Sequence, residues 1–251
     1  GCSNAGQNVV VTVNPIPVLS STLTPASICS GATFSYTPTS LTTGSTFGWS
    51  RAAVGGITEG ASSGSGAINE TLTNTTSAPI AVTYVIVTSA NSCSNTPGQN
   101  VVVVVEPVPS LVNPGNQVLC AGASTTAIDF VTTGVGTQYN WTNTNSTIGL
   151  PLSGSGNIAS FTAVNTGTAP VTATITVTPV YNGCTGSNQV FTITVNPIPV
   201  LSTTLTPGAI CSGTAFSYTP TSSTTGATFA WSRAAVAGIS EGASSGAVSI
   251  N

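Results

Sequence analysis

The chain has 251 residues, of which 40% are apolar and 3% charged, and its formal net charge at pH 7 is −3. Two arginines, five acidic residues and no Lys or His leave too few titratable groups for catalysis, for activating a cofactor or for a histidine-containing metal site. Nucleic acid would require a basic face and a membrane helix about 18 consecutive apolar residues, so we expect no enzyme, metal, cofactor, nucleic-acid partner or membrane span.

Short runs of alternating or β-branched residues, bounded by Gly, Pro, Asn and Ser, predict β-strands along the whole chain. The first expected strands are residues 9–13, as the last strand of an incomplete module, and an edge strand within residues 18–23. The next expected strands are residues 33–37, 46–51, 54–58, 67–73, 81–89 and 99–105. Six or seven short strands in about 90 residues are typical of an immunoglobulin-like or fibronectin-like sandwich.

The cysteines mark a repeat of 91 residues. They form two series with that spacing, Cys2, Cys93 and Cys184, and Cys29, Cys120 and Cys211. One tryptophan follows each cysteine of the second series after 20 or 21 positions, and we expect all three to be core residues: Trp49, Trp141 and Trp231. The first and third modules are near copies (FSYTPTSLTTGSTFGWSRAAV and FSYTPTSSTTGATFAWSRAAV), whereas the middle module shares only the framework.

These patterns predict an all-β chain of tandem immunoglobulin-like (PKD/fibronectin-like) β-sandwich modules arranged end to end. Its expected parts are the last strand of a truncated module (1–14), module A (15–106), module B (107–196) and a truncated module A (197–251). The linkers PIP, PVP and PIP hold the backbone extended. We expect the chain to be a segment of a longer array.

The cysteine spacing, without any C-x-x-C pair, indicates disulfides formed in an oxidising compartment, so we expect a secreted protein at the cell surface or outside the cell. Two pairings remain open. Bonds Cys29–Cys93 and Cys120–Cys184 would lie within modules, but a seven-strand sandwich places such cysteines at opposite ends, beyond the roughly 7 Å that Cα atoms of a disulfide allow. The alternative joins neighbouring modules through Cys29 and Cys184.

Two charged pairs flank short hairpins, Arg51 with Glu59 and Arg233 with Glu241. They could form a binding spot, but we expect cross-strand salt bridges worth under about 1 kcal/mol if exposed. The middle module lacks the pair.

Several motifs together resemble a known family: ICSG before a strand, a Trp about 20 residues later, LTNTTSAPIAVTYVIV leading to a Cys-Ser turn, and QNVVVTVNPIP at the module end. They are similar to the PKD-like and immunoglobulin-like repeats of giant secreted surface adhesins and filament proteins of Bacteroidota. The resemblance covers the whole chain and is looser in the middle module, which lacks SRAAV. It implies export by the type IX route, attachment at the cell surface and a role in the stalks of adhesins or filaments.

We therefore expect a non-catalytic structural segment forming the shaft of a long extracellular filament or cell-surface adhesin, used for attachment, gliding or gripping other cells. Few charges mean little repulsion between copies, so the expected partners are other copies or neighbouring modules in a homo-oligomeric fibre, with any ligand at the fibre tip. One variant is exchange of the strand at residues 9–13 between chains. The alternative is a spacer or carbohydrate-binding region of a secreted multidomain enzyme.

Overall fold

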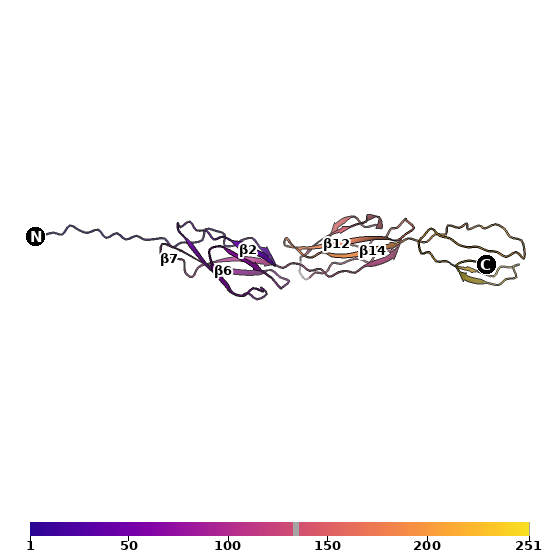
Figure 1. Cartoon of the computed structure of the whole chain (residues 1–251), viewed down its shortest axis with the longest axis horizontal. Coiled ribbons are helices and arrows are strands. Elements are labelled where there is room, and N and C mark those ends of the chain that lie inside the picture. The colour runs from indigo at the N-terminus through magenta and orange to yellow at the C-terminus, as the bar shows by residue number, and fades with distance from the viewer. Residues whose placement is uncertain (133–135, 251) are drawn as a thin grey trace. The chain divides into compact units, whose positions relative to one another are not determined.

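The computed structural model describes residues 1–132 and 136–250, and these form β-strands and one short 3₁₀ helix but no α-helix (Figure 1). Residues 133–135, within expected module B, and residue 251, at the end of the last expected module, lie outside the described residues. The chain divides into two compact units. Unit 1 comprises Gly1–Leu111, Thr132–Gln138 and Pro179–Ser187, and unit 2 comprises Val112–Val131, Tyr139–Thr178 and Asn188–Asn251.

The first repeat forms a sandwich of two sheets. Strands of the larger sheet lie in the order β1 (Ile28–Cys29), β8 (Gln99–Glu106), β6 (Ile80–Ala90), β3 (Thr46–Arg51) and β4 (Ser62–Ser65), with β7 (Cys93–Ser94) also paired to β6. The smaller sheet pairs β2 (Ala32–Tyr36) with β5 (Ile68–Leu72). β1 runs parallel to β8, and the other pairs are antiparallel. This confirms the expected immunoglobulin-like sandwich.

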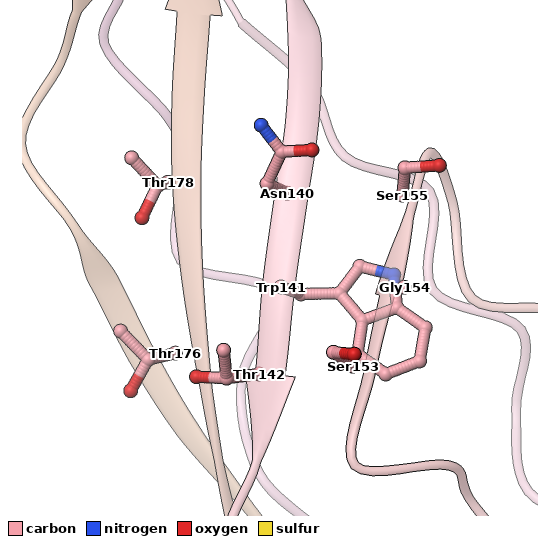
Figure 2. A pocket seen from close by; sticks show the side chains of 8 residues that line it. All are labelled: Asn140, Trp141, Thr142, Ser153, Gly154, Ser155, Thr176 and Thr178. Carbon is pink, nitrogen blue, oxygen red and sulfur yellow. The ribbon is translucent and has the colours of Figure 1, made fainter.

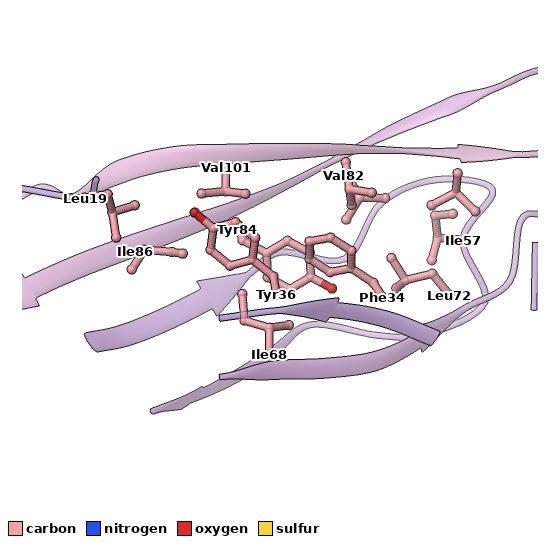
Figure 3. Packing of buried hydrophobic residues seen from close by; sticks show 12 residues of the cluster. Leu19, Phe34, Tyr36, Ile57, Ile68, Leu72, Val82, Tyr84, Ile86 and Val101 are labelled. Atoms are coloured by element: carbon pink, nitrogen blue, oxygen red, sulfur yellow. The ribbon is translucent and has the colours of Figure 1, made fainter. Parts of the chain in front are cut away.

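The core of this sandwich follows from the period of two in its long strands. Every second residue of β6 and β8 points inward, and those at 82, 84, 86, 101, 103 and 105 have an exposed fraction of 0%. Figure 3 shows Phe34 and Tyr84 among these aliphatic side chains, and their ring centroids lie 5.2 Å apart. Burial therefore alternates with a period of two along both strands, even though β8 contains five consecutive valines.

The second repeat has the same strand order. Its sheet runs β11 (Ser153–Ser155), β10 (Gln138–Asn143), β12 (Val171–Tyr181), β14 (Gln189–Asn196) and β9 (Gln117–Cys120), and β13 (Cys184–Thr185) pairs with β12. The parallel edge strand is again the first of the repeat, because β9 pairs with β14. The 3₁₀ helix η1 (Ser146–Ile148) follows β10. Two immunoglobulin-like modules thus occur in tandem, followed in the third repeat by β15 (Ala230–Arg233) and β16 (Ser244–Ala247).

Two strand predictions in the first repeat are wrong. Residues 54–58 form a turn, in which the Ile57 amide donates to the Val54 carbonyl at 3.1 Å, because Gly56 adopts a φ of 85° there. Residues 18–23 form no strand, although Leu19 is buried. The strand beside β3 is instead β4, which the Ser- and Gly-rich sequence did not indicate.

Residues 9–13 were also expected to form a strand and do not. The valines at 9, 10, 11 and 13 are 77–88% exposed, whereas in β8 Val101, Val103 and Val105 are buried and the valines between them are half-buried. β8 lies between β1 and β6, which supply hydrogen bonds on both edges, but no strand lies beside residues 9–13. An isolated β-strand has no ladder to satisfy its backbone, so this segment is extended and exposed.

Candidate functional site

One buried charged site lies in the first repeat, where three strands bring an arginine, a glutamate and a tyrosine together. Arg51 ends β3 and is 3% exposed, and its Nε donates to the Glu70 Oε2 at 3.0 Å. Tyr84, from β6, donates its hydroxyl to the same carboxylate oxygen at 2.5 Å. The guanidinium also lies over the Tyr84 ring, 5.9 Å from its centroid. This arrangement satisfies a charge inside an otherwise apolar core.

The expected salt bridge between Arg51 and Glu59 is a prediction that the structure corrects. Arg51 donates to main-chain carbonyls of the loop after β3, from Nη1 to Glu59 at 3.3 Å and from Nη2 to Gly60 at 2.7 Å, while its ion pair is with Glu70. The Glu59 carboxylate instead accepts from the Thr73 amide at 2.8 Å. The predicted salt bridge required residues 54–58 to form a strand paired with β3, which would have placed Arg51 and Glu59 opposite each other. Residues 54–58 do not form that strand.

The corresponding pair of the third repeat behaves in the same way. Arg233 Nη2 donates to the carbonyls of Glu241 at 3.3 Å and Gly242 at 2.6 Å, and the described residues contain no ion pair between the Arg233 and Glu241 side chains. Both arginines therefore hold the loop after their strand through its backbone, which sequence reasoning did not identify.

The pKa values of this site keep its groups in fixed ionisation states. Burial raises the pKa of Glu70. The nearby Ser62 hydroxyl, although it makes no full hydrogen bond, and the donors Tyr84 and Arg51 lower this pKa by more, so it lies below its usual range. The Thr73 amide lowers the pKa of Glu59. Burial, followed by the hydrogen bond to the Glu70 carboxylate, raises the pKa of Tyr84.

Such groups stabilise structure and do not transfer protons near neutral pH. An ionised Glu70 and a neutral Tyr84 persist across the physiological range. Within residues 1–132 and 136–250, no group of three or more Cys, Asp or Glu side chains could hold a metal ion. None of the described helices is long and apolar enough to cross a membrane.

The three tryptophans share a packing arrangement with a glycine on the adjacent strand. They pair in register as Trp49 with Gly64, Trp141 with Gly154 and Trp231 with Gly246. A Cβ atom on any of these glycines would overlap the indole ring. Trp141 is buried, Trp49 packs against the core cluster, and Trp231 is half-buried. The tryptophan is a packing residue, and its glycine partner was missed by sequence reasoning.

An open groove runs beside Trp141 (Figure 2). Its other lining residues are small and mostly polar: Asn140, Thr142, Ser153, Gly154, Ser155, Thr176 and Thr178. Figure 2 shows the Trp141 indole lying across Gly154. Because Trp141 is only 7% exposed, it offers too little aromatic surface to stack on a sugar ring.

The remaining candidate is the disulfide site, which we define as Cys29, Glu106, Asn182 and Cys184, all in unit 1. Cys29 and Cys184 form a disulfide with 5.5 Å between their Cα atoms and 155 residues between them in sequence. Of the two pairings that the sequence left open, this is the one that links the first repeat to the second. Cys93 is a free thiol.

Strand geometry explains why Cys29 does not reach Cys93. Cys29 pairs with Glu106, at the end of β6 that carries Ile80, whereas Cys93 pairs with Ala90 at the other end. The eleven-residue strand between them spans roughly 33 Å at 3.3 Å per residue, far beyond disulfide reach.

The second half of the disulfide site is a tight hairpin. Asn182 and Gly183 adopt positive φ values of 44° and 82°, which turns β12 back into β13 and presents Cys184. The Asn182 Nδ2 donates to the Glu106 Oε2 at 3.0 Å. Gly186 has no room for a Cβ, which would overlap the Pro109 carbonyl oxygen. A covalent bond, a hydrogen bond and close packing thus meet at one place.

Comparison with known families agrees with this geometry. A family model described as PKD-like domain matches residues 26–109. No curated protein matches the chain. The matched range begins just before β1 and ends just after β8, so it covers the first sandwich.

Solved structures with a similar course of the chain are immunoglobulin-like or cadherin repeats of low identity. A three-domain structure of titin I67-I69, an E-to-A variant, is 11% identical with a TM-score of 0.47, covering 93% of this chain and 86% of its own. The DIP-gamma IG1+IG2 structure is 10% identical (TM-score 0.37, covering 72% and 98%). Drosophila N-cadherin EC1-3 is 14% identical (TM-score 0.27, covering 73% and 68%). The family match and the sheet order agree that residues 26–109 are similar to a PKD-like domain and form an immunoglobulin-like sandwich, a module that fits a structural or adhesive role.

Proposed function

We propose that this chain is a tension-bearing structural segment in the shaft of an extracellular filament or cell-surface adhesin. The observation that carries the proposal is the Cys29–Cys184 bond, which closes a covalent loop around the first sandwich and all strands of the second except β14. Force applied between the chain ends passes directly from Cys29 to Cys184. Residues 30–183 then carry no tension, so pulling cannot extend them while the bond is intact.

The magnitude of this effect is large. A separation of 155 residues corresponds to about 500 Å of extended chain at 3.3–3.6 Å per residue. Without the bond, forced unfolding of the segment between the two cysteines would release that length. A shaft that transmits load must keep a constant length under force. The Cys29–Cys184 bond keeps this length constant, because it prevents the enclosed residues from extending.

The low charge supports lateral association of such segments, since few like charges repel one another. The resemblance to secreted surface repeats of Bacteroidota adds export by the type IX route, a location at or outside the cell surface, and a fibre of several copies to the proposal. A disulfide fits an oxidising location of that kind. Gripping or attachment would then belong to other parts of the fibre.

Single-molecule force extension tests the tensile role. The oxidised chain should lack the extension of about 500 Å, and the Cys29→Ser/Cys184→Ser variant should gain it. Cys2→Ser is the matched control, because Cys2 is an exposed free thiol. Equal extension in the oxidised chain and the double variant would contradict the proposal.

Electron cryo-microscopy of cells labelled with an antibody against the PIPVLS linker tests the location. Label along extracellular fibres is the expected result. Label confined to a secreted enzyme complex would refute the filament role and favour the spacer alternative.

A further inference from the structure

Four of the six cysteines fall into two structural kinds, and one complementary pair of these four is bonded. The first kind lies at the end of a short parallel edge strand, where Cys29 pairs with Glu106 on β8 and Cys120 pairs with Asn196 on β14. In both places the amide of the next residue donates to the carbonyl of the paired residue at 2.8 Å. Cys120 therefore stands where Cys29 stands, but its thiol is exposed and free. We call these two residues strand cysteines.

The second kind lies at the tip of a hairpin. Cys93 pairs with Ala90 across β6 and β7, and Cys184 pairs with Tyr181 across β12 and β13. Both turns contain two residues of positive φ, 48° and 64° before Cys93, and 44° and 82° before Cys184. Cys93 and Cys184 are thus hairpin cysteines of the same geometry, and Cys93 is free.

The hairpin of Cys93 also contacts the chain segment that corresponds to the partner of the Cys184 hairpin. Asn14 precedes a Pro-x-Pro linker as Glu106 does, and its Nδ2 donates to the Asn91 carbonyl at 3.1 Å. The Cys93 Sγ lies 3.9 Å from the Asn14 carbonyl oxygen. In the disulfide site, the strand cysteine pairs with Glu106 itself. A strand cysteine paired with Asn14 in the same register would consequently lie beside the Cys93 thiol.

We propose that Cys93 and Cys120 each form a disulfide of the same type as Cys29–Cys184, by bonding to the complementary kind of cysteine in another repeat. The partner of Cys93 is a strand cysteine and the partner of Cys120 is a hairpin cysteine. At the separation of 155 residues seen for Cys29 and Cys184, each partner lies in another repeat of the same chain or, in trans, in a second copy. The inference holds whether or not the chain forms a filament.

Bond formation requires an oxidant, which we assign to a low-molecular-weight disulfide such as oxidised glutathione. One thiolate attacks this disulfide and releases one reduced thiol, and the second cysteine then displaces the other. The two protein thiols lose two protons and two electrons, and the small disulfide becomes two thiols. Because each bond spans 155 residues and the repeat is 91 residues long, the loops closed by successive bonds would overlap along a run of repeats.

A tandem chain tests the proposal in the correct register. Residues 1–196 followed directly by residues 15–251 keep the repeat, because NPIPVLS occurs at both 14–20 and 196–202. In this chain the first-copy Cys120 and the second-copy Cys93 are separated by 155 residues. After refolding with reduced and oxidised glutathione, pepsin digestion and mass mapping should yield a Cys93–Cys120 peptide from monomers, besides Cys29–Cys184. Pepsin is preferred to trypsin, because the chain has no Lys and only two Arg.

Matched variants assign the copies. First-copy Cys120→Ser should abolish the Cys93–Cys120 peptide and expose one further thiol to alkylation, whereas second-copy Cys120→Ser should leave the peptide unchanged. The 251-residue chain, oxidised in parallel, distinguishes the source of the partner. Covalent dimers carrying a Cys93–Cys120 peptide would assign it to a second copy, and the tandem monomer alone would assign it to a neighbouring repeat. Absence of this peptide from both chains would overturn the proposal.

Discussion

The first and second repeats hold the loop that follows β3 or β10 with different side chains. Arg51 ends β3 and Asn143 ends β10, and both side chains are buried, at 3% and 5% exposure. Each side chain turns back on the loop that follows its strand and donates to three carbonyls. Those of Arg51 belong to Ala52, Glu59 and Gly60, and those of Asn143 belong to Asn145, Leu150 and Pro151.

The difference lies in charge. A buried guanidinium requires a counter-ion, which Glu70 supplies, while Tyr84 satisfies the same carboxylate. The amide of Asn143 is neutral and needs no counter-ion, and β12 carries the buried Ile175 at the position of Tyr84 in β6. Burial of an ion pair is not in itself more stabilising than a neutral arrangement, but removal of one partner is costly. The first repeat should therefore be the more sensitive to substitution and to acid.

The largest effect should follow Arg51→Ala. The substitution leaves the Glu70 carboxylate without its counter-ion and the loop carbonyls without their donor, and we expect a loss of about 4 kcal/mol in the stability of the first repeat. Hydrogen–deuterium exchange of peptides from β5 and β6 should locate the loss. Arg233→Ala is the control and should change stability by about 1 kcal/mol at most, because Arg233 loses hydrogen bonds to exposed loop carbonyls but has no ion-pair partner among the described residues. Similar losses in both variants would refute a special role for the buried ion pair.

A second test concerns the glycine that packs against the tryptophan in both repeats. Gly154→Ala places a Cβ against the Trp141 indole, and Gly64→Ala does the same to Trp49. We expect each to cost about 2–3 kcal/mol in its own repeat, since the rigid ring can move only by separating the paired strands. Gly48→Ala, in β3 with open space around it, is the matched control and should be nearly neutral. Thermal unfolding with local hydrogen exchange would detect the difference, and equal effects at Gly48 and Gly154 would contradict the packing.

Asn143→Ala should have a smaller effect than Arg51→Ala. It removes hydrogen bonds to three carbonyls but leaves no unpaired charge, so we expect a loss of about 2 kcal/mol confined to the second repeat. Urea unfolding with hydrogen exchange in β10 would measure it. If Asn143→Ala cost as much as Arg51→Ala, the charge of Arg51 would not explain the contrast between the repeats.

The sequence predicted those features that follow from regular local patterns. Runs rich in β-branched residues identified the long strands β6 and β8, and cysteine spacing identified the repeat, but in the valine run of β8 only the structure shows which side chains face the core. β4 was missed because Ser and Gly have low strand propensity, and its place depends on Gly64 lying beside Trp49. The partner of Arg51 was missed for a different reason. Glu70 follows nineteen residues later on the other sheet, and only the packing of the two sheets brings the charges together.

The smallest expected effect is a difference between the two repeats in how much stability each loses in acid. The folded first repeat lowers the pKa of Glu70 and Glu59 below the usual value of 4.5, so it binds fewer protons than the unfolded chain in this range. The resulting stabilisation is complete above pH 4.5 and is lost as the pH falls through the lower folded-state values. The Asn143 site has no ionisable group. Between about pH 5 and pH 2, hydrogen exchange corrected for its intrinsic pH dependence should therefore show a greater loss of protection in β5 and β6 than in β10 and β12.

Glu70→Gln sharpens this measurement. The amide keeps a hydrogen-bond acceptor for Tyr84 but cannot be protonated in this range, so the variant should be less stable than the native chain at pH 7 and should lose less on acidification. The two stability curves should converge at low pH, because the protonated carboxyl of Glu70 and the amide of the variant are both neutral and both leave Arg51 without its counter-ion. Parallel curves from neutral to acidic pH would instead mean that Glu70 does not stabilise the fold through its charge, and the difference between the repeats would reduce to hydrogen bonding alone.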